Sequence, residues 1–413
     1  WYSSAIESRR CFAGGAMPRD VMTEPSKTQL DDSLAWLADS SEVRNLLLTL
    51  WQRARLDWSF VSTSVADAFR KRKLGPRERR AVAESLYGMI RHHRRVDEAL
   101  EAGGWRSGQR APDAERVLAY LVLEEGLDPA RAAQEAPELD WEAIAKIDEK
   151  LEALSSPAQR VARRHSFPDW LAKRLCADWG DEAEDLARAL GQRAPMTVRA
   201  NTLKGARDAL QQSLAGHGIS THPGALSSTS LIFDTRVNLF GLSEFKEGLF
   251  EAQDEGSQLI AELVAPPPKG AVIDICAGAG GKTLALAALL HGRGRLLATD
   301  PYKKKLDELR RRCRRAGASN VQAAVIDADP KAAWPPAVDR WRGGADRILV
   351  DAPCSGIGSL RRNPEARWRL TEAEVAGLPA QQLAICERAV GLLAPGGRLI
   401  YATCTVLRDE NEN

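Results

Sequence analysis

From residue 253 onward the chain alternates short apolar runs with helical segments, and this alternation restricts the possible folds more than any other feature. Strands are predicted over residues 271–276, 295–299, 321–326, 347–350 and 398–403. Helices are predicted between them, over residues 282–290, 302–316 and 379–393. Strands connected through helices run parallel, so residues 253–413 are expected to form a doubly wound, Rossmann-like α/β domain. Such a sheet binds ligands beyond the carboxyl ends of its strands.

The residues before this domain follow other patterns. Apolar side chains recur at helical spacing through residues 28–190, so this part is predicted to be an all-α domain. Within it, a Gly-Pro start signal predicts one continuous helix over residues 76–100. Residues 195–252 are predicted to form a small α+β domain, with short strands over residues 197–201, 231–233 and 249–251 and one helix over residues 206–217.

Bulk composition excludes several classes of protein. The 413 residues carry a formal net charge of +2, so total charge does not identify a partner. The seven cysteines include no C-x-x-C pair, which argues against a zinc site. Their odd number in a chain of this length argues against a disulfide framework and fits a reducing cytoplasm. No apolar run is long enough to span a membrane. Residues 1–27 lack the apolar core of a signal peptide, and we expect a disordered or non-native leader there, with a natural start at Met17 or Met22. The sequence does not define an oligomeric state, and a monomer is favoured.

A glycine-rich turn follows the first predicted strand of the α/β domain. It reads Cys276, Ala277, Gly278, Ala279, Gly280, Gly281 and Lys282. Glycines let the backbone approach a ligand, and a helix N-terminus favours negative charge. A P-loop would require glycine where Cys276 stands, so an NTPase is disfavoured. Asp300 and Asp327 end the next two strands, where carboxylates can meet ribose hydroxyls and an adenine amino group. The pattern indicates a nucleoside-type ligand, although either acid alone is as well explained by a solvated strand end.

Two cysteines follow strands that are expected to be neighbours in the sheet. Cys354 lies in the run Asp-Ala-Pro-Cys-Ser-Gly that begins at Asp351, and Cys404 follows the last predicted strand. A lone cysteine is most often an inert buried thiol. Two cysteines at the functional edge of one sheet, one of them near an aspartate, favour a reactive pair instead.

These segments together resemble a known enzyme family. Residues 276–283, 351–356 and 401–412 are similar to the RsmB/Nop/Sun family of RNA cytosine-5 methyltransferases, within it most of all to the bacterial 16S rRNA methyltransferase B group. The similarity also covers residues 199–204, and more faintly residues 74–100, which resemble a NusB-type RNA-binding domain. The resemblance implies a class I methyltransferase domain with S-adenosylmethionine as cofactor and RNA as partner.

The resemblance also implies a role for each candidate residue. Cys404 would be the nucleophile that attacks carbon 6 of cytosine, and Cys354 would assist release of the product. Asp351 would hold the cytosine at N3. The cofactor would be held by the turn residues Cys276, Ala277, Gly278, Ala279, Gly280, Gly281 and Lys282 together with Asp300, Asp327 and Asp351. A thiolate that adds to carbon 6 activates carbon 5, which is otherwise a poor nucleophile. The target base must be unpaired or flipped out to be reached.

The sequence departs from the family pattern in two places. Gly278 and Ala279 replace the usual Ala-Pro of the turn, which leaves every backbone donor in place. The sequence also ends at Asn413, where family members continue with a helix and a final pair of strands. We therefore expect a domain truncated at its C-terminus, with the strand over residues 398–403 at an exposed edge.

Contact with RNA is predicted from a basic cluster that directly follows the Asp351 segment. It contains Arg361, Arg362, Arg367 and Arg369. Arginines bind phosphate without reading sequence, and Trp368 beside them either packs or stacks on a base. Ribosomal RNA is favoured by the NusB-like region, and transfer RNA stays open. The rival class is a non-catalytic RNA-binding protein that keeps the methyltransferase fold, against which the presence of both cysteines argues.

Overall fold

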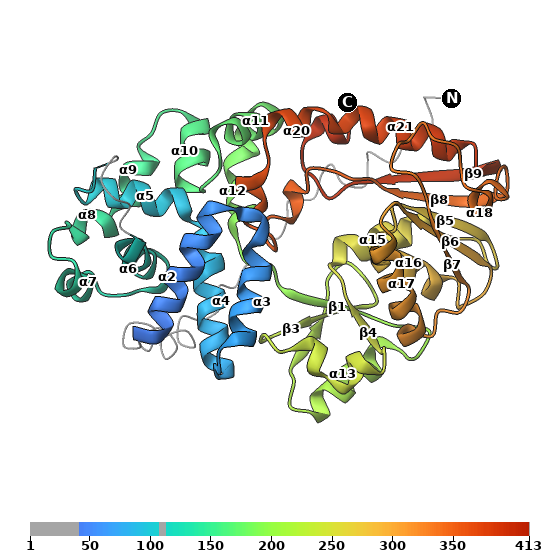
Figure 1. The fold of residues 1–413 in the computed structure, drawn as a ribbon, viewed down its shortest axis with the longest axis horizontal. Coiled ribbons are helices and arrows are strands. Elements are labelled where there is room, and N and C mark those ends of the chain that lie inside the picture. Colours follow the sequence, from blue (N-terminus) through green and yellow to red (C-terminus); the bar gives the residue numbers. More distant parts are fainter. Residues whose placement is uncertain (1–40, 107–112, 413) are drawn as a thin grey trace.

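A computed structural model describes residues 41–106 and 113–412 (Figure 1). The expected leader over residues 1–27 lies outside the described residues. The chain forms a helical region, a small antiparallel sheet and a parallel α/β sheet, in that order.

The helical region packs around one core of its own. Its elements are α2 (Ser41–Leu56), η4 (Trp58–Phe60), α3 (Val61–Lys71), α4 (Pro76–Arg91), α5 (His93–Ala102), α6 (Asp113–Glu125), α7 (Pro129–Glu135), α8 (Trp141–Ala145) and α9 (Ile147–Glu152). The apolar stripe of α2 is buried in this core, including Leu47 and Trp51. Burial of that stripe stabilises α2, because most helical stability in proteins comes from packing of an amphipathic face.

The single helix predicted over residues 76–100 is wrong, since the chain forms two helices there. The break falls at His92, whose backbone leaves the helical region at φ −106° and ψ 15°. The turn redirects α5, so that Val96 and Leu100 enter the core shared with α2 and α6. Tertiary packing thus overrides an apolar spacing that continues through the break.

Three further helices pack against a later part of the chain. They are α10 (Pro157–Arg164), α11 (Asp169–Trp179) and α12 (Ala183–Gly191), with η5 (Gly180–Glu182) between the last two. Phe167 and Leu171 share a hydrophobic core with Ile357 and Leu360, which follow the Asp351 segment. The helices before the small sheet therefore support the loop that carries Cys354.

The small sheet has four antiparallel strands in the order β2-β3-β1-β4. The strands are β1 (Met196–Ala200), β2 (Thr221–Pro223), β3 (Ser230–Phe233) and β4 (Phe250–Ala252), accompanied by α13 (Arg207–Gly216), η6 (Leu239–Gly241) and α14 (Ser243–Lys246). The predicted strands at β1, β3 and β4 and the helix at α13 are confirmed. Strand β2 has no buried residue and no apolar alternation, so the sequence did not predict it.

The last part forms the predicted parallel sheet, in the order β7-β6-β5-β8-β9. Its strands are β5 (Ala271–Ile275), β6 (Arg295–Asp300), β7 (Val321–Val325), β8 (Ala345–Asp351) and β9 (Leu393–Ala402). Its longer helices are α15 (Glu255–Val264), α16 (Gly281–Leu289), α17 (Lys303–Ala316) and α21 (Leu378–Val390). Its short helices are α18 (Pro336–Asp339), η7 (Ile357–Ser359), α19 (Ala366–Arg369), α20 (Glu372–Ala376) and η8 (Arg408–Glu410).

The two faces of this sheet are covered separately. Helices α15, α16 and α17 pack on one face with Val272 and Leu349, while α18 and α21 pack on the other with Ile273 and Val350 (Figure 1). All pairs in the sheet are parallel, which confirms the doubly wound architecture. Strand β9 lies at one edge, as predicted. Within residues 41–106 and 113–412, no helix is both long enough and apolar enough to cross a membrane.

Candidate active site

The turn between β5 and α16 has a shape that its glycines permit. Cys276 leaves the strand at φ +63°, and Gly280 caps α16 at φ +88°. A Cβ on Gly280 would lie 2.7 Å from Leu309 Cγ, so only glycine fits without movement of α17. The turn is also held from outside, because Gly278 N donates to Asp300 Oδ2 at 3.0 Å and Arg312 donates to Ala279 O at 2.9 Å. The backbone is therefore fixed and closely packed from behind.

Three acids lie in or just after β5, β6 and β7, toward the carboxyl ends of these strands. Asp300 is buried, and its carboxylate accepts backbone N–H groups from Gly278 and Tyr302, at 3.0 Å and 2.8 Å. Asp327 is exposed just past β7. Asp274 is fully buried behind the turn; burial raises its pKa to about 7, and Thr283 Oγ1 donates to it at 2.6 Å. A glycine cradle between two strand-end carboxylates fits a nucleoside with a charged amino-acid tail, which is the chemistry of S-adenosylmethionine.

The two cysteines meet at the carboxyl ends of β8 and β9, which are neighbours in the sheet. Their Sγ atoms lie 3.3 Å apart, and Cys404 N also donates to Cys354 Sγ at 3.3 Å. Cys404 is exposed, whereas Cys354 is half-buried. The structure thus brings together two thiols that are 50 residues apart in sequence, within reach of a shared proton.

This contact separates the acidities of the two thiols. The hydrogen bond from Cys354 lowers the pKa of Cys404 from its ordinary value of 9.0 to about 7, against the opposing effects of burial and of Asp351. The same bond, together with burial, raises the pKa of Cys354. Cys404 is therefore the thiolate of the pair near neutral pH, and a thiolate is the nucleophilic form of cysteine.

We expect the reactivity of Cys404 to follow this lowered pKa. The thiolate fraction falls as pH drops below about 7, so alkylation of Cys404 by iodoacetamide should slow about tenfold per pH unit there and level off above it. Site-resolved mass spectrometry of the full chain measures the profile. Cys386 is an internal reference, because burial raises its pKa and it should react only at higher pH. A midpoint near 9 for Cys404 would contradict the assignment.

Lys282 and Asp351 form an ion pair beside the cysteines. Lys282 Nζ lies 2.7 Å from Asp351 Oδ2, and the lysine side chain is 14% exposed. Lys282 comes from the first turn of α16, and Asp351 is the last residue of β8. The pair therefore joins the turn after β5 to the segment that carries Cys354 and places a protonated amine beside it.

A buried polar group behind the cysteines was missed by sequence reasoning. Ser355 and Thr405, which directly follow the two cysteines, have hydroxyls 2.7 Å apart, and Glu410 and Gln382 bond to this site from behind. The only sequence signal was that Glu410 lies a few residues after Cys404. Nothing in the sequence around Gln382 marks it.

The four arginines of the basic cluster do not share one environment. Arg361 and Arg362 line a pocket of about 300 Å³ with Asp254 and Gly358, and Arg369 is exposed. Gly358 N donates to Cys404 O at 2.9 Å, so this pocket adjoins the cysteine site.

The prediction for Arg367 is corrected. Its side chain is fully buried over the ring of Phe167, and it donates to the carbonyls of His165 and Ser166 at 3.1 Å and 3.0 Å, so it cannot reach a phosphate. Trp368 is also packed, with Nε1 donating to Ile90 O at 2.9 Å. Both residues hold the loop after Cys354 against the helices.

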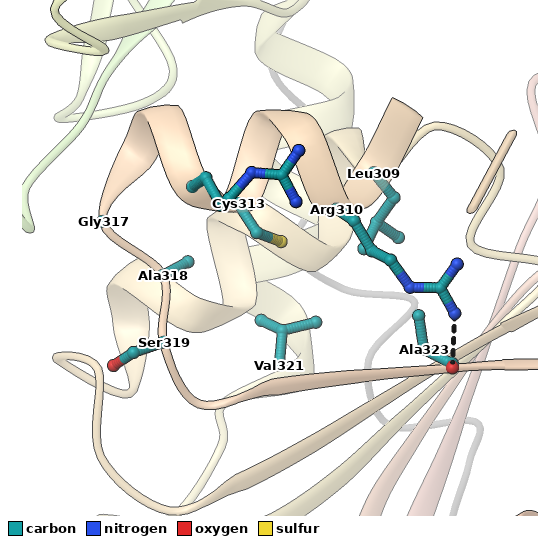
Figure 2. A pocket seen from close by; sticks show the side chains of 9 residues that line it. Leu309, Arg310, Cys313, Gly317, Ala318, Ser319, Val321 and Ala323 are labelled. Atoms are coloured by element: carbon teal, nitrogen blue, oxygen red, sulfur yellow. Dashed lines mark hydrogen bonds between the residues drawn. The ribbon is translucent and has the colours of Figure 1, made fainter. Parts of the chain in front are cut away.

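A second pocket lies elsewhere on the α/β domain. It has a volume of about 430 Å³ between α17 and β7, lined by Leu309, Cys313 and Val321 among others (Figure 2). Figure 2 shows Arg310 at its side, where the guanidinium donates to Ala323 O at 3.0 Å. None of the candidate residues lines it, so it is not part of this site. Within the described part of the chain, no three potential metal ligands gather.

Comparison with known proteins agrees with this geometry. A family model described as 16S rRNA methyltransferase RsmB/F matches residues 261–413, and one described as an RsmF/B-like, ferredoxin-like domain matches residues 167–239. The probable ribosomal RNA small subunit methyltransferase B of Synechocystis sp. is 30% identical over 383 residues, which are 86% of this chain and 83% of that protein. The chain belongs to the RsmB/F methyltransferase family. As an RsmB/F member it is an S-adenosylmethionine-dependent methyltransferase, which confirms the predicted family and cofactor.

Solved structures support the fold of this RsmB/F member. The crystal structure of PH0851 has a TM-score of 0.69 at 24% identity and covers 95% of this chain and 88% of its own. The structure of NSun6 from Pyrococcus horikoshii with SFG, an S-adenosylmethionine analogue, has a TM-score of 0.54 at 22% identity and covers 60% of this chain and 85% of its own. The Rossmann-like methyltransferase fold is thereby confirmed, whereas the NusB-like nature of the helical region stays a prediction.

Proposed function

We propose that this chain methylates carbon 5 of a cytosine in ribosomal RNA, with Cys404 as a covalent nucleophile. The observation that carries the proposal is the 3.3 Å contact between Cys354 and Cys404. The segment that carries Cys354 is tied to the turn after β5 through the ion pair of Asp351 with Lys282. A methyltransferase that acts on oxygen or nitrogen needs no thiol, whereas an unactivated carbon needs a nucleophile that adds beside it. The choice of ribosomal RNA is supported by the name of the Synechocystis relative.

The reaction would begin at the thiolate. Cys404 Sγ adds to carbon 6 of an extruded cytosine, and the electron pair of the 5,6 double bond moves toward carbon 5 and N3. Lys282 Nζ and Asp351 Oδ2 lie 2.7 Å apart and share a proton, and this proton would be donated to N3 as negative charge develops there. When bound in the turn, S-adenosylmethionine supplies the methyl group that carbon 5 takes up. Asp300 and Asp327 would hold its adenosine part, and the backbone from Cys276 to Lys282 its charged tail.

The second cysteine would complete the cycle. After methylation, carbon 5 carries both a proton and the new methyl group. Cys354 assists the removal of that proton, and the electron pair of the broken C–H bond restores the 5,6 double bond. Cys404 leaves as a thiolate, and N3 returns its proton to the pair formed by Lys282 and Asp351. Formation of the thioether removes the charged acceptor that keeps the proton on Cys354, so Cys354 can lose that proton to solvent and act as a base only once the adduct exists. Each thiol then has one role, in a fixed order.

RNA would approach over the pocket lined by Arg361 and Arg362. This pocket adjoins the backbone of Cys404 through Gly358, so a nucleotide next to the extruded cytosine would lie there. Arg362 is paired with Asp254 and is 36% exposed, so an RNA phosphate would compete for it with that carboxylate. Arg369 is exposed on the same segment and is proposed as an outer phosphate contact.

The proposal is tested by trapping the adduct. In Cys354→Ala, addition at carbon 6 proceeds and elimination stalls, so the protein should stay linked to RNA on a denaturing gel in the presence of S-adenosylmethionine. Incubation with total RNA and with a small-subunit rRNA transcript reports both the linkage and the substrate. The band should be sensitive to nuclease.

The matched control is the double variant Cys354→Ala, Cys404→Ala, which keeps the fold and the loss of Cys354 but has no nucleophile. Its band should vanish. If Cys354→Ala binds the cofactor and RNA yet gives no band, covalent cytosine chemistry is wrong and another methyl acceptor is favoured. A band with transfer RNA alone would reject only the ribosomal substrate.

A further inference from the structure

The peptides that follow the two cysteines are joined by their hydroxyls. Ser355 follows Cys354 and is 6% exposed, and Thr405 follows Cys404. Their Oγ atoms lie 2.7 Å apart. The two segments are also joined by the bonds at the sulfur atoms and by Gly358 N, which donates to Cys404 O at 2.9 Å. Ser355 is next to Cys354 in the chain, so its position bears directly on the separation of the two thiols.

Glu410 holds Ser355 from behind. It lies in η8 with only 2% of its surface exposed. Its Oε2 accepts from Ser355 N at 2.8 Å, and its Oε1 accepts from Ser355 Oγ. A buried carboxylate is tolerated only when its oxygens accept hydrogen bonds, and bonds to a charged acceptor are the strong ones. Two bonds to a single serine fix both the position and the orientation of that residue.

Gln382 of α21 completes the buried group. It is 2% exposed, and its Nε2 donates to Glu410 Oε2 and to Pro353 O, each at 3.0 Å. Pro353 directly precedes Cys354, so the segment is held on both sides of the cysteine. Tyr401 OH lies 3.0 Å from Gln382 Oε1 and 2.6 Å from Glu410 O, which ties the group to β9.

We infer that Glu410, with Gln382, is a positioning residue for the cysteine pair: it holds the Cys354 segment against the Cys404 segment at the distance where the two thiols share a proton. The inference rests on the proposed function, in which the two cysteines act as a pair. Glu410 does not touch the reacting atoms and acts through Ser355.

The sign of the effect separates this role from a plain electrostatic one. A carboxylate near a thiol opposes loss of the thiol proton, so removal of its charge alone would make Cys404 more reactive. Loss of the geometry would make Cys404 less reactive, because the hydrogen bond from Cys354 is the largest influence that favours its thiolate. The two roles therefore predict opposite changes in one measurement.

The test is the pH profile of Cys404 alkylation in Glu410→Gln, measured on the full chain without RNA. The glutamine amide is uncharged and has one acceptor oxygen where the carboxylate has two, so Ser355 Oγ must turn from donor to acceptor and both bonds to Ser355 are weakened. We expect alkylation at pH 7 to slow at least tenfold, with the midpoint of the profile moved up toward 9 and the parental rate regained at high pH. An unchanged profile, or a faster reaction at pH 7, would overturn the inference.

The chain offers a matched control in Glu244→Gln. Glu244 is also 2% exposed and accepts from Ser213 Oγ at 2.8 Å, but it lies beside the small antiparallel sheet. The Glu244→Gln variant should lose similar thermal stability and keep the parental pH profile of Cys404 alkylation.

If Glu410→Gln does not fold, Ser355→Ala is used for the test instead. This variant loses the hydroxyl contacts and keeps the backbone bond, and alkylation of Cys404 is expected to slow about threefold. An unchanged profile there also overturns the inference. Alkylation needs no RNA, so failure of adduct trapping would reject the proposed function without touching this result.

Discussion

Cys404→Ala should abolish methyl transfer while leaving the cofactor site intact. Loss of a covalent nucleophile removes the reaction path itself, and such losses reach a thousandfold or more, or about 4 kcal/mol of transition-state stabilisation. Cys404 is exposed and contributes nothing to a hydrophobic core, so little stability should be lost. Transfer of labelled methyl groups to rRNA measures activity, and calorimetry measures the affinity for S-adenosylmethionine.

The control for this substitution is Cys386→Ala. Cys386 is another free cysteine of the same sheet domain, half-buried where Cys404 is exposed, and it packs from α21 against the face remote from α16. It should keep activity within about twofold. If Cys404→Ala stays active while Cys354→Ala loses activity without trapping RNA, the nucleophile is Cys354, and the order of the two roles proposed above is reversed.

Gly280→Ala should weaken cofactor binding and destabilise the fold together. Alanine at φ +88° costs about 1–2 kcal/mol, and its Cβ would meet Leu309 Cγ at 2.7 Å, which requires α17 or the turn to move. Gly280 caps the helix whose N-terminus is proposed to face the ligand, so we expect a loss of affinity for S-adenosylmethionine of tenfold or more. Calorimetry and a thermal melt with and without cofactor give the two quantities.

Gly343→Ala separates backbone strain from the effect on the ligand. Gly343 has φ +65°, and a Cβ there meets nothing within 4 Å. It should lower the melting temperature through the same strain and leave cofactor affinity unchanged. A folded Gly280→Ala variant with parental affinity would mean that the turn after β5 does not shape the cofactor site.

The central strands β5, β6 and β8 of the parallel sheet were predictable because they are largely buried and therefore contain continuous apolar runs. The turn after β5 and both cysteines were predictable for a related reason, since strand ends in such a sheet meet at one edge. The break at His92 was not, because the apolar spacing continues through it and only packing of Val96 and Leu100 decides the direction of α5.

The least predictable part of the site is how its residues are held. Arg367 and Arg369 are two residues apart and look alike in the sequence, yet one is fully buried over Phe167 and the other is exposed. That difference depends on helices far away in the chain. The bond between Glu410 and Ser355 spans 55 residues in the same way. Local patterns report which face of an element is apolar, and they carry no information about which polar groups meet across elements.

The core that α10, α11 and α12 share with the loop after Cys354 limits where a chimera of two related enzymes can change from one parent sequence to the other. A crossover at residue 190 would take Phe167 and Leu171 from one parent and Ile357 and Leu360 from the other, although these four side chains fill one volume. Interiors packed to crystal-like density tolerate such mismatches poorly. A crossover ahead of α10 keeps the whole set from one parent. The segment around Cys354 and the three helices that precede both sheets should therefore come from the same parent.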